Sequence, residues 1–267
     1  MIQFDEAHGV LRLSVHDLVR AGEWPFDETD VWLSPRRARM GQAVHARYLS
    51  AQDGQDYRAE VPVRWEGVID GVAVHVEGRA DGCRRTERGI EVEEIKSTLR
   101  SGYLLSEMGL NPAHAEQCGF YCLFLAEMGQ AVCGGRVKYL PVGSDAARVF
   151  EIPFLPEEWW NRLRERVATI LAERRAGARR ADRRRQYAVR MAFPFAVERE
   201  GQRAMMEAVT GALGEGQPLM CAAPTGIGKT AAALYPGLKI ALERDGLLVF
   251  ATAKVSQQEL ALDTLRR

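Results

Sequence analysis

Residues 71–98 read GVAVHVEGRADGCRRTERGIEVEEIKST, and the rest of the predicted fold is arranged around them. Apolar and polar residues alternate along 71–82 and again along 89–98, with the turn-forming sequence CRRTERG between them. Alternation of this kind is typical of β-strands with one buried face. Residues 57–65, YRAEVPVRW, alternate in the same way, so the sequence predicts an antiparallel β-meander over residues 57–98.

Two acids and a lysine form a pattern within this meander. Asp81 is expected to end one strand, and Glu94 and Lys96 lie two residues apart on the next. Because side chains alternate along a strand, Glu94 and Lys96 share one face and Glu93 points to the other. Paired carboxylates suit Mg²⁺ or Mn²⁺, and a neighbouring lysine activates water or stabilises charge on a phosphate. The same residues also fit a solvated hairpin, so the pattern alone leaves both interpretations open.

Helices are predicted on both sides of the meander. A Ser-Pro dipeptide before RRARM is typical of a capped helix start, which predicts a helix over residues 35–51 that carries His45. The stretch 111–129 has helical periodicity and stops at a glycine, and it carries Gln117 and Tyr121 four residues apart on one face. These three side chains are expected to project toward the sheet. The remaining histidines are expected to be structural: His8, His16, His75 and His114.

The following segments complete one α/β unit. A second strand pair is expected over residues 134–142 and 147–154. A long helix is expected to begin at Pro156, because a proline followed by two acids is typical of a helix start. Between residues 162 and 190 this helix is rich in arginine. Such a segment is either the solvated face of a helix with a linker or a contact for nucleic-acid phosphates, and the sequence leaves both open.

In sequence order the chain presents Gly-x-x-x-His, Asp, Glu-x-Lys and Gln-x-x-x-Tyr. In this order the motifs resemble the RecB-type branch of the PD-(D/E)xK nucleases, which includes the CRISPR-associated RecB-like exonucleases. The resemblance implies a restriction-endonuclease-like α/β core that cuts DNA with Mg²⁺ or Mn²⁺. It also implies residue roles: His45, Asp81, Glu94 and the carbonyl of Ile95 as metal ligands, Lys96 as the catalytic lysine, and Gln117 and Tyr121 as DNA contacts or supports of the site.

Composition and charge narrow the class of protein. The 267 residues carry 36 basic and 36 acidic side chains, and no apolar run reaches the length of a membrane span. The first residues contain acids where a secretion signal has bases, so we expect a cytoplasmic protein without a membrane partner. The five cysteines lack paired spacing, which predicts reduced thiols. Many RecB-like nucleases hold an iron-sulfur cluster with one early and three late cysteines. No cysteine precedes Cys83 here, so we do not expect such a cluster.

A second motif lies near the end of the sequence. Residues 222–231 read AAPTGIGKTA, which fits the phosphate-binding loop G-x-x-x-x-G-K-[ST] except that Ala223 replaces the first glycine. The apolar residues before the loop and the stretch 246–254 are expected to be buried strands, with a helix between them. In that context Lys229 contacts the β- and γ-phosphates of ATP, and the Thr230 hydroxyl binds Mg²⁺.

The sequences FPF, REGQ, APTGIGKT and VFATAKVSQQELALDTL follow one another from residue 193 onward. In this order they resemble the opening motifs of XPD/DinG-type superfamily 2 DNA helicases. The resemblance implies a RecA-like fold in which Gln202 recognises adenine and residues 252–258 contact single-stranded DNA. The ATP phosphates would be held by Thr225, Gly226, Gly228, Lys229 and Thr230. Fewer than forty residues follow the loop, so we expect only the truncated beginning of a RecA-like domain, as in the N-terminal part of a longer nuclease-helicase.

These features divide the chain into three expected parts: a nuclease domain over residues 1–155, an arginine-rich helix and linker over 156–192, and an incomplete ATP-binding domain over 193–267. The expected activity is metal-dependent DNA cleavage coupled to ATP-driven unwinding, in DNA repair or defence, on single-stranded or frayed DNA. An alternative is an inactive nuclease fold that only grips DNA for the helicase. The combination of three metal ligands with Lys96 argues against that alternative, and RNA stays open as a substrate.

Overall fold

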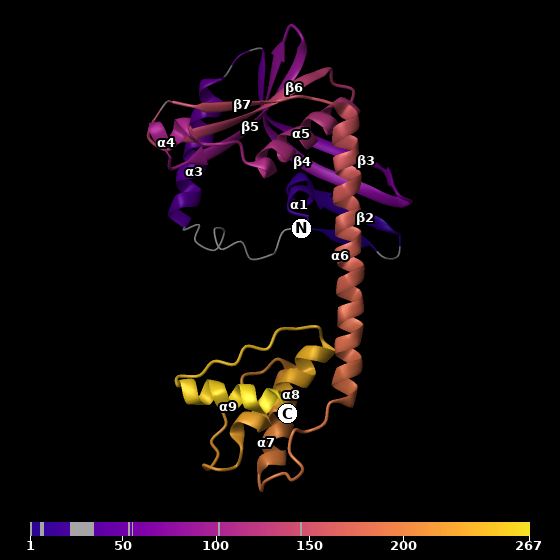
Figure 1. Cartoon of the computed structure of the whole chain (residues 1–267), viewed down its shortest axis with the longest axis vertical. Coiled ribbons are helices and arrows are strands. Elements are labelled where there is room, and N and C mark those ends of the chain that lie inside the picture. The colour runs from indigo at the N-terminus through magenta and orange to yellow at the C-terminus, as the bar shows by residue number, and fades with distance from the viewer. Residues whose placement is uncertain are drawn as a thin grey trace. The chain divides into compact units, whose positions relative to one another are not determined.

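The computed structural model describes residues 2–5, 8–21, 35–52, 54, 56–100, 102–144 and 146–267. The chain forms two compact units, unit 1 (Met1–Glu173) and unit 2 (Arg174–Arg267) (Figure 1). The boundary falls inside one long helix, α6 (Pro156–Arg190), which begins at the expected proline and continues through the arginine-rich segment. Ser34, the expected cap of the helix over 35–51, lies outside the described residues. Among the residues described, no helix is long and apolar enough to cross a membrane.

Unit 1 has a mixed α/β fold built on a seven-stranded sheet (Figure 1). The strands are β1 (Gln3–Asp5), β2 (Val10–Ser14), β3 (Tyr57–Ile69), β4 (Val72–Thr86), β5 (Gly89–Thr98), β6 (Val132–Pro141) and β7 (Arg148–Ile152). They lie in the order β1-β2-β4-β5-β6-β7, and β3 pairs with β4 outside this path. The β2–β4 and β5–β6 pairs are parallel and the others are antiparallel. The predicted meander and the predicted second strand pair are therefore confirmed.

Strand β4 is shared by three neighbours. β3 pairs along nearly its whole length, whereas the opposite edge is divided between β2, which pairs with residues 73–77, and β5, which pairs with residues 82–86. Residues 78–81 lie between these two ladders. The expectation that Asp81 ends a strand is therefore wrong, because β4 continues to Thr86 and only residues 87–88 form the turn. Asp81 lies instead in the gap where the edge of β4 passes from β2 to β5.

Helices flank the sheet at α1 (Val15–Val19), α3 (Pro35–Ala51), α4 (Tyr103–Ser106) and α5 (Pro112–Glu127). Local sequence explains two of their starts. Ser14 and Asp17 form a capping box, in which Asp17 N donates to Ser14 Oγ at 3.1 Å and Ser14 N donates to Asp17 Oδ2 at 2.9 Å. The Asn111 side chain accepts from Ala113 N at 2.9 Å at the start of α5. α5 stops shortly before Gly129, whose φ of 83° is left-handed, as its sequence predicts.

Helix α5 is packed between the sheet and the start of α6. Its residue Phe120 is fully buried, which contributes about 2–3 kcal/mol of apolar burial. Gly119 allows α6 to approach closely, because a Cβ at this position would lie 2.2 Å from the ring of Trp159. Arg166 on α6 donates twice to the buried carboxylate of Glu116, at 3.1 and 2.6 Å. This bidentate ion pair fixes the first turns of α6 against α5.

Unit 2 consists of the end of α6 with α7 (Gln202–Glu215), α8 (Lys229–Glu243) and α9 (Val255–Leu265). Residues 146–267 are all described, and β7 is the last strand among them. The two strands predicted beside the phosphate-binding loop are therefore wrong, since 217–224 and 246–252 have no regular structure. Most of their apolar side chains are exposed, Met220 by 98% and Leu247 by 89%. An extended segment becomes a strand only when a neighbour pairs with its backbone, and neither segment has a ladder partner.

Candidate functional site

Asp81 closes the gap between the two ladders on the edge of β4. Its Oδ2 atom accepts a hydrogen bond from the backbone N–H of Ile95 on β5 at 2.7 Å. The β4–β5 ladder itself reaches only the pair of Gly82 and Glu93. The carboxylate therefore takes the place that a backbone carbonyl would have in a continued ladder, and this bond fixes Asp81 against β5 beside Glu94.

Glu94 and Lys96 meet Gln117 of α5 on one face of β5. Lys96 Nζ lies 2.7 Å from Glu94 Oε1 and donates to Gln117 Oε1 at 3.0 Å. The Glu94 side chain is only 2% exposed, and its other oxygen, Oε2, is buried without a hydrogen-bond partner among the residues described. An unpaired buried carboxylate oxygen is costly. This atom therefore marks the point at which a further positive or donor group would be accommodated.

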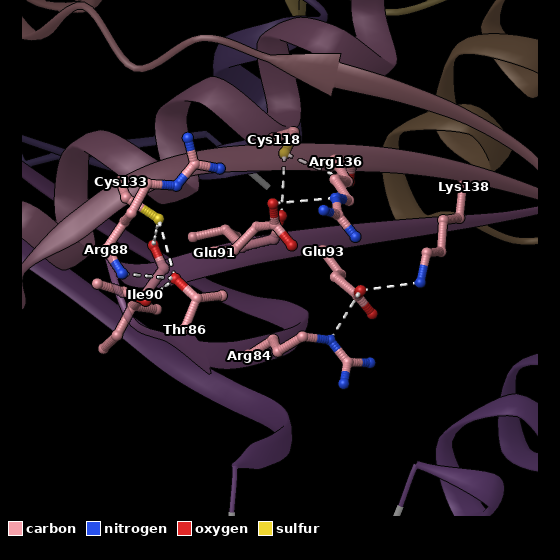
Figure 2. A network of polar contacts seen from close by, with 12 residues as sticks. Arg84, Thr86, Arg88, Ile90, Glu91, Glu93, Cys118, Cys133, Arg136 and Lys138 are labelled. Carbon is pink, nitrogen blue, oxygen red and sulfur yellow. Dashed lines mark hydrogen bonds and ion pairs between the residues drawn. The ribbon is translucent and has the colours of Figure 1, made fainter.

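Glu93 lies on the opposite face of β5. Figure 2 shows its carboxylate between Arg84 and Lys138, at 3.7 Å from Arg84 Nε and 2.8 Å from Lys138 Nζ. Tyr48 of α3 donates to the same carboxylate at 3.2 Å. None of these three contacts involves Lys96, the partner of Glu94 on β5. The prediction that Glu93 and Glu94 point to different faces is confirmed, and Glu93 serves as the centre of a buried ion pair.

Burial sets the protonation of the site. It raises the pKa of Glu94 to about 7, a rise that Lys96 opposes and the charge of Asp81 increases. Burial also lowers the pKa of His45. The charge of Asp81 opposes this decrease, and the charge of Lys96 adds to it. Neutral imidazole is the form that binds metals. A carboxyl group with a pKa of about 7 exchanges its proton for a cation near neutral pH, since metal ligands must be deprotonated.

Tyr121 is buried behind the acidic residues. Its side chain is 5% exposed, and a Cβ on Gly78 would lie 2.8 Å from the tyrosine ring and 2.8 Å from Val15. Gly78 belongs to the gap at residues 78–81, so the ring fills space that only glycine leaves open. Burial raises the pKa of Tyr121 to about 12, and the charge of Glu94 adds to this rise. Of the two roles that the resemblance implies for Tyr121, the packing agrees with support of the site.

The donor atoms suit a hard divalent cation. Asp81 and Glu94 supply carboxylate oxygens, and His45 lines the adjoining cavity. Within the described ranges, no three His, Cys, Asp or Glu side chains converge as a ready ligand cluster. Each of the two carboxylates has a protein partner, the Ile95 N–H for Asp81 and the Lys96 ammonium for Glu94. The unpartnered Oε2 of Glu94 is the ligand atom that a cation would satisfy.

A cavity of about 600 Å³ opens beside Lys96. Basic, hydroxyl and imidazole side chains line it, among them His45, Lys96, Ser97, Arg100, His114 and Tyr139, and no carboxylate belongs to the described lining. His114 was expected to be structural, and it lines this cavity. The available signal was its position one helical turn before Gln117, which places both on the same face of α5. Burial lowers the pKa of His114 to about 4, and Lys96 adds to the effect.

The phosphate-binding motif lies at the start of α8. The expected phosphate contacts fall in the loop or in the first turn of the helix: Thr225, Gly226, Gly228, Lys229 and Thr230. Gly226 and Gly228 have left-handed φ angles of 89° and 82°. Lys229 Nζ donates to the carbonyl oxygens of Ala223 and Pro224 at 2.6 and 2.8 Å. The lysine is therefore folded back over its own loop.

Gln202 contacts this loop from the first residue of α7. Its side chain is almost fully buried, and Nε2 donates to the Gly228 carbonyl at 3.2 Å while Oε1 accepts from Arg199 N at 3.0 Å. α7 begins directly after Gly201, which has a left-handed φ of 75°. The fold thus brings Gln202 against the glycine turn.

No protein-family model and no curated protein matches this chain. Among solved structures, the chain is similar to the crystal structure of SSO0001, with a TM-score of 0.45 and 22% sequence identity. The match covers 64% of this chain and 79% of that chain. A likeness of this size carries no information about ligands or chemistry. The candidate site therefore rests on the residues and geometry of this chain.

Proposed function

We propose that unit 1 is a metal-dependent nuclease of the PD-(D/E)xK type that hydrolyses phosphodiester bonds of DNA. The observation that carries the proposal is the grouping of Asp81, Glu94 and Lys96. Glu94 Oε1 lies 2.7 Å from the Lys96 ammonium, and its other oxygen, Oε2, is buried without a partner among the residues described. A purely structural ion pair gains nothing from such an unsatisfied oxygen. The basic, hydroxyl-rich lining of the adjoining cavity favours a phosphate-bearing substrate.

Each side chain has a proposed role. The ligands of Mg²⁺ or Mn²⁺ are His45, Asp81, Glu94 and the carbonyl of Ile95. When bound, such an ion lowers the pKa of water and neutralises charge on a phosphate. Lys96 places a positive charge where negative charge builds up on the attacked phosphate. Gln117 is a positioning residue, because its 3.0 Å hydrogen bond holds the Lys96 ammonium.

Cleavage of single-stranded DNA with Mg²⁺, with Mn²⁺ and with EDTA tests this proposal. We expect cutting with either metal and none with EDTA. Lys96→Ala should lower the rate at least about 100-fold, since the charge acts on the transition state. Lys229→Ala is the matched control, because it removes a lysine of unit 2 and leaves the unit 1 site unchanged. Equal rates for Lys96→Ala and the parent would contradict the proposal. DNA binding without any cleavage would favour the inactive gripping module.

We further propose that unit 2 binds ATP with Mg²⁺ as the beginning of a RecA-like helicase domain. The supporting observation is the hydrogen bond from Gln202 to Gly228, which holds an amide suited to adenine against the phosphate-binding motif. In this proposal Lys229 exchanges its carbonyl contacts for the β- and γ-phosphates, and Thr230 binds Mg²⁺. Coupled unwinding would deliver single-stranded or frayed DNA to the nuclease site in a cytoplasmic repair or defence reaction.

ATP binding and hydrolysis separate this second proposal from the first. A fluorescent ATP analogue with Mg²⁺ should bind the parent, and Lys229→Ala should weaken binding at least about tenfold, because the lysine contacts the phosphates. Lys239→Ala on the same helix is the control. Hydrolysis should be negligible, since the sequence offers no Walker B acid after the loop. Steady hydrolysis that Lys229→Ala abolishes would contradict this expectation.

A further inference from the structure

The cavity beside Lys96 contains a second ordered group that the proposed nuclease mechanism leaves unused. Tyr139 on β6 is the direct neighbour of Lys96 in the β5–β6 ladder, so their side chains lie on the same face of the sheet. His114 comes from α5, which covers that face. All three side chains line the cavity of about 600 Å³. An imidazole and a phenol are thus held next to the lysine that acts on a phosphate.

Hydrogen bonds orient the His114 ring. The backbone N–H of Asn111 donates to Tyr139 Oη at 3.0 Å, and Tyr139 Oη lies 2.9 Å from His114 Nδ1. We assign the hydroxyl proton to the contact with Nδ1, because Oη already accepts from Asn111. With Nδ1 as the acceptor, neutral His114 carries its own proton on Nε2. Burial and Lys96 keep the ring neutral, since they lower its pKa to about 4.

We propose that this cavity is a subsite for the DNA phosphate next to the one that is cut, and that His114 Nε2–H donates to a non-bridging oxygen of that phosphate. The inference rests on the proposed nuclease function and deepens it. The volume is within the range of pockets that hold small ligands, and Arg100 and the Ser97 hydroxyl line it together with Lys96. The cavity adjoins the proposed metal site, because His45 and Ile95 also line it, but no carboxylate belongs to its described lining.

A neutral donor suits this position for an electrostatic reason. The subsite already holds the positive charges of Lys96 and Arg100 and adjoins the place proposed for a divalent cation, so a charged imidazolium would add a further repulsion. Neutral His114 instead donates a hydrogen bond without adding a positive charge. Tyr139 is 2% exposed and is itself held by Asn111 N, so the ring is oriented before DNA arrives. His114 is accordingly a substrate-binding residue that fixes the position of the strand.

Binding of DNA in EDTA tests the subsite independently of cleavage. Fluorescence anisotropy would compare an unmodified single-stranded oligonucleotide with a set in which one phosphate at a time is a neutral methylphosphonate. For the parent, we expect one position at which the substitution lowers affinity about tenfold, the size of a hydrogen bond to a charged group. His114→Asn can still accept from Tyr139 but lacks the outer donor, so it should bind unmodified DNA about tenfold more weakly and lose sensitivity at that position. His114→Gln keeps a donor at the outer position and should retain most of the affinity.

Controls separate the subsite from a merely structural role. His16→Ala removes an exposed histidine of α1 and should bind like the parent. Thermal unfolding of each variant shows whether the fold is retained. The proposal is overturned if the parent has no sensitive position, if His114→Asn responds like the parent, or if His114→Gln falls as far as His114→Asn. A failure of the nuclease proposal would appear instead in the cleavage assay, since no metal is present during these binding measurements.

Discussion

Lys96 in unit 1 and Lys229 in unit 2 occupy the two proposed phosphate sites, and their surroundings differ. Lys96 is held by Glu94 on its own strand and by Gln117 on a separate helix. Lys229 bonds to carbonyl groups of its own loop, five and six residues away in sequence. A site assembled from several elements is oriented by the fold before the ligand arrives, whereas a site within one loop takes its final shape from the ligand.

The packing around the two lysines shows the same contrast. The sheet beneath Lys96 has fully buried apolar side chains, such as Val92 and Val137. The extended segments beside the loop of Lys229 expose Met220 and Leu247 almost completely. The proposed Glu-x-Lys site therefore depends on its sheet, whereas the proposed phosphate-binding loop needs mainly a turn and the start of a helix.

Backbone hydrogen exchange should give the largest difference between the units. Amides of β5 and β6 are expected to open with a free energy of at least about 5 kcal/mol, close to global unfolding. Residues 217–224 and 246–252 lack ladder partners, so their amides are expected to exchange nearly as fast as in an unfolded chain. Hydrogen–deuterium exchange with mass spectrometry measures all four segments in one sample. Strong protection of 217–224 would show that these amides are hydrogen-bonded. That result would contradict the difference between the two units and support the strand that the sequence predicts.

Removal of Glu93 should destabilise unit 1 more than any other change of an acid on β5. Glu93→Ala leaves the ammonium of Lys138, which is 12% exposed, without its counter-charge, and we expect a loss of about 3–5 kcal/mol in the free energy of unfolding. Glu94→Ala should cost less stability but abolish cleavage. Urea unfolding followed by a cleavage assay of the folded fraction measures both. A Glu93→Ala protein as stable as the parent would show that the ion pair of Glu93 and Lys138 does not stabilise unit 1.

The pH dependence of stability should identify Glu94. Its pKa of about 7 in the folded protein lies above the ordinary 4.5, which corresponds to about 3 kcal/mol. Because the folded protein holds this proton more tightly than the unfolded chain, the associated stability is fully present below pH 4.5 and is lost as the pH rises through about 7. Glu94→Gln stays neutral, so in EDTA it should match the parent near pH 5 and exceed it by up to about 3 kcal/mol at pH 8. Parallel curves for the two proteins in urea titrations from pH 5 to 8 would refute this assignment.

Much of unit 1 was predictable because the decisive signals are local. The alternation of residues 89–98 determines that Glu93 and Glu94 face opposite sides, and Ser14 begins a helix through a bond to a residue three positions away. The contact of His114 with Tyr139 was not predictable in this way. Tyr139 lies 25 residues further along the chain, and its hydroxyl is 2.9 Å from His114 Nδ1. The sequence carries no local trace of that bond.

The errors have the same origin. Asp81 precedes a turn-like sequence, and only the pairing of residues 82–86 with β5 shows that β4 continues past it. The apolar stretch 246–252 has the composition of a strand, but a strand also requires a partner with free backbone groups, which composition does not specify. In both cases a tertiary pairing decided the local structure.

The division of one edge of β4 between β2 and β5 has a consequence for the order of folding. β3, β4 and β5 are joined by short turns, so their pairing needs little loop closure and is expected early. β2 must reach residues 73–77 across some sixty residues of chain, as in the pair Val10 and Ala73, and is expected to dock late. Residues 78–81 lie between two paired strands, β2 and β5, only after that step. Competence to bind a metal ion should therefore appear with the last kinetic phase of refolding, after the meander has formed.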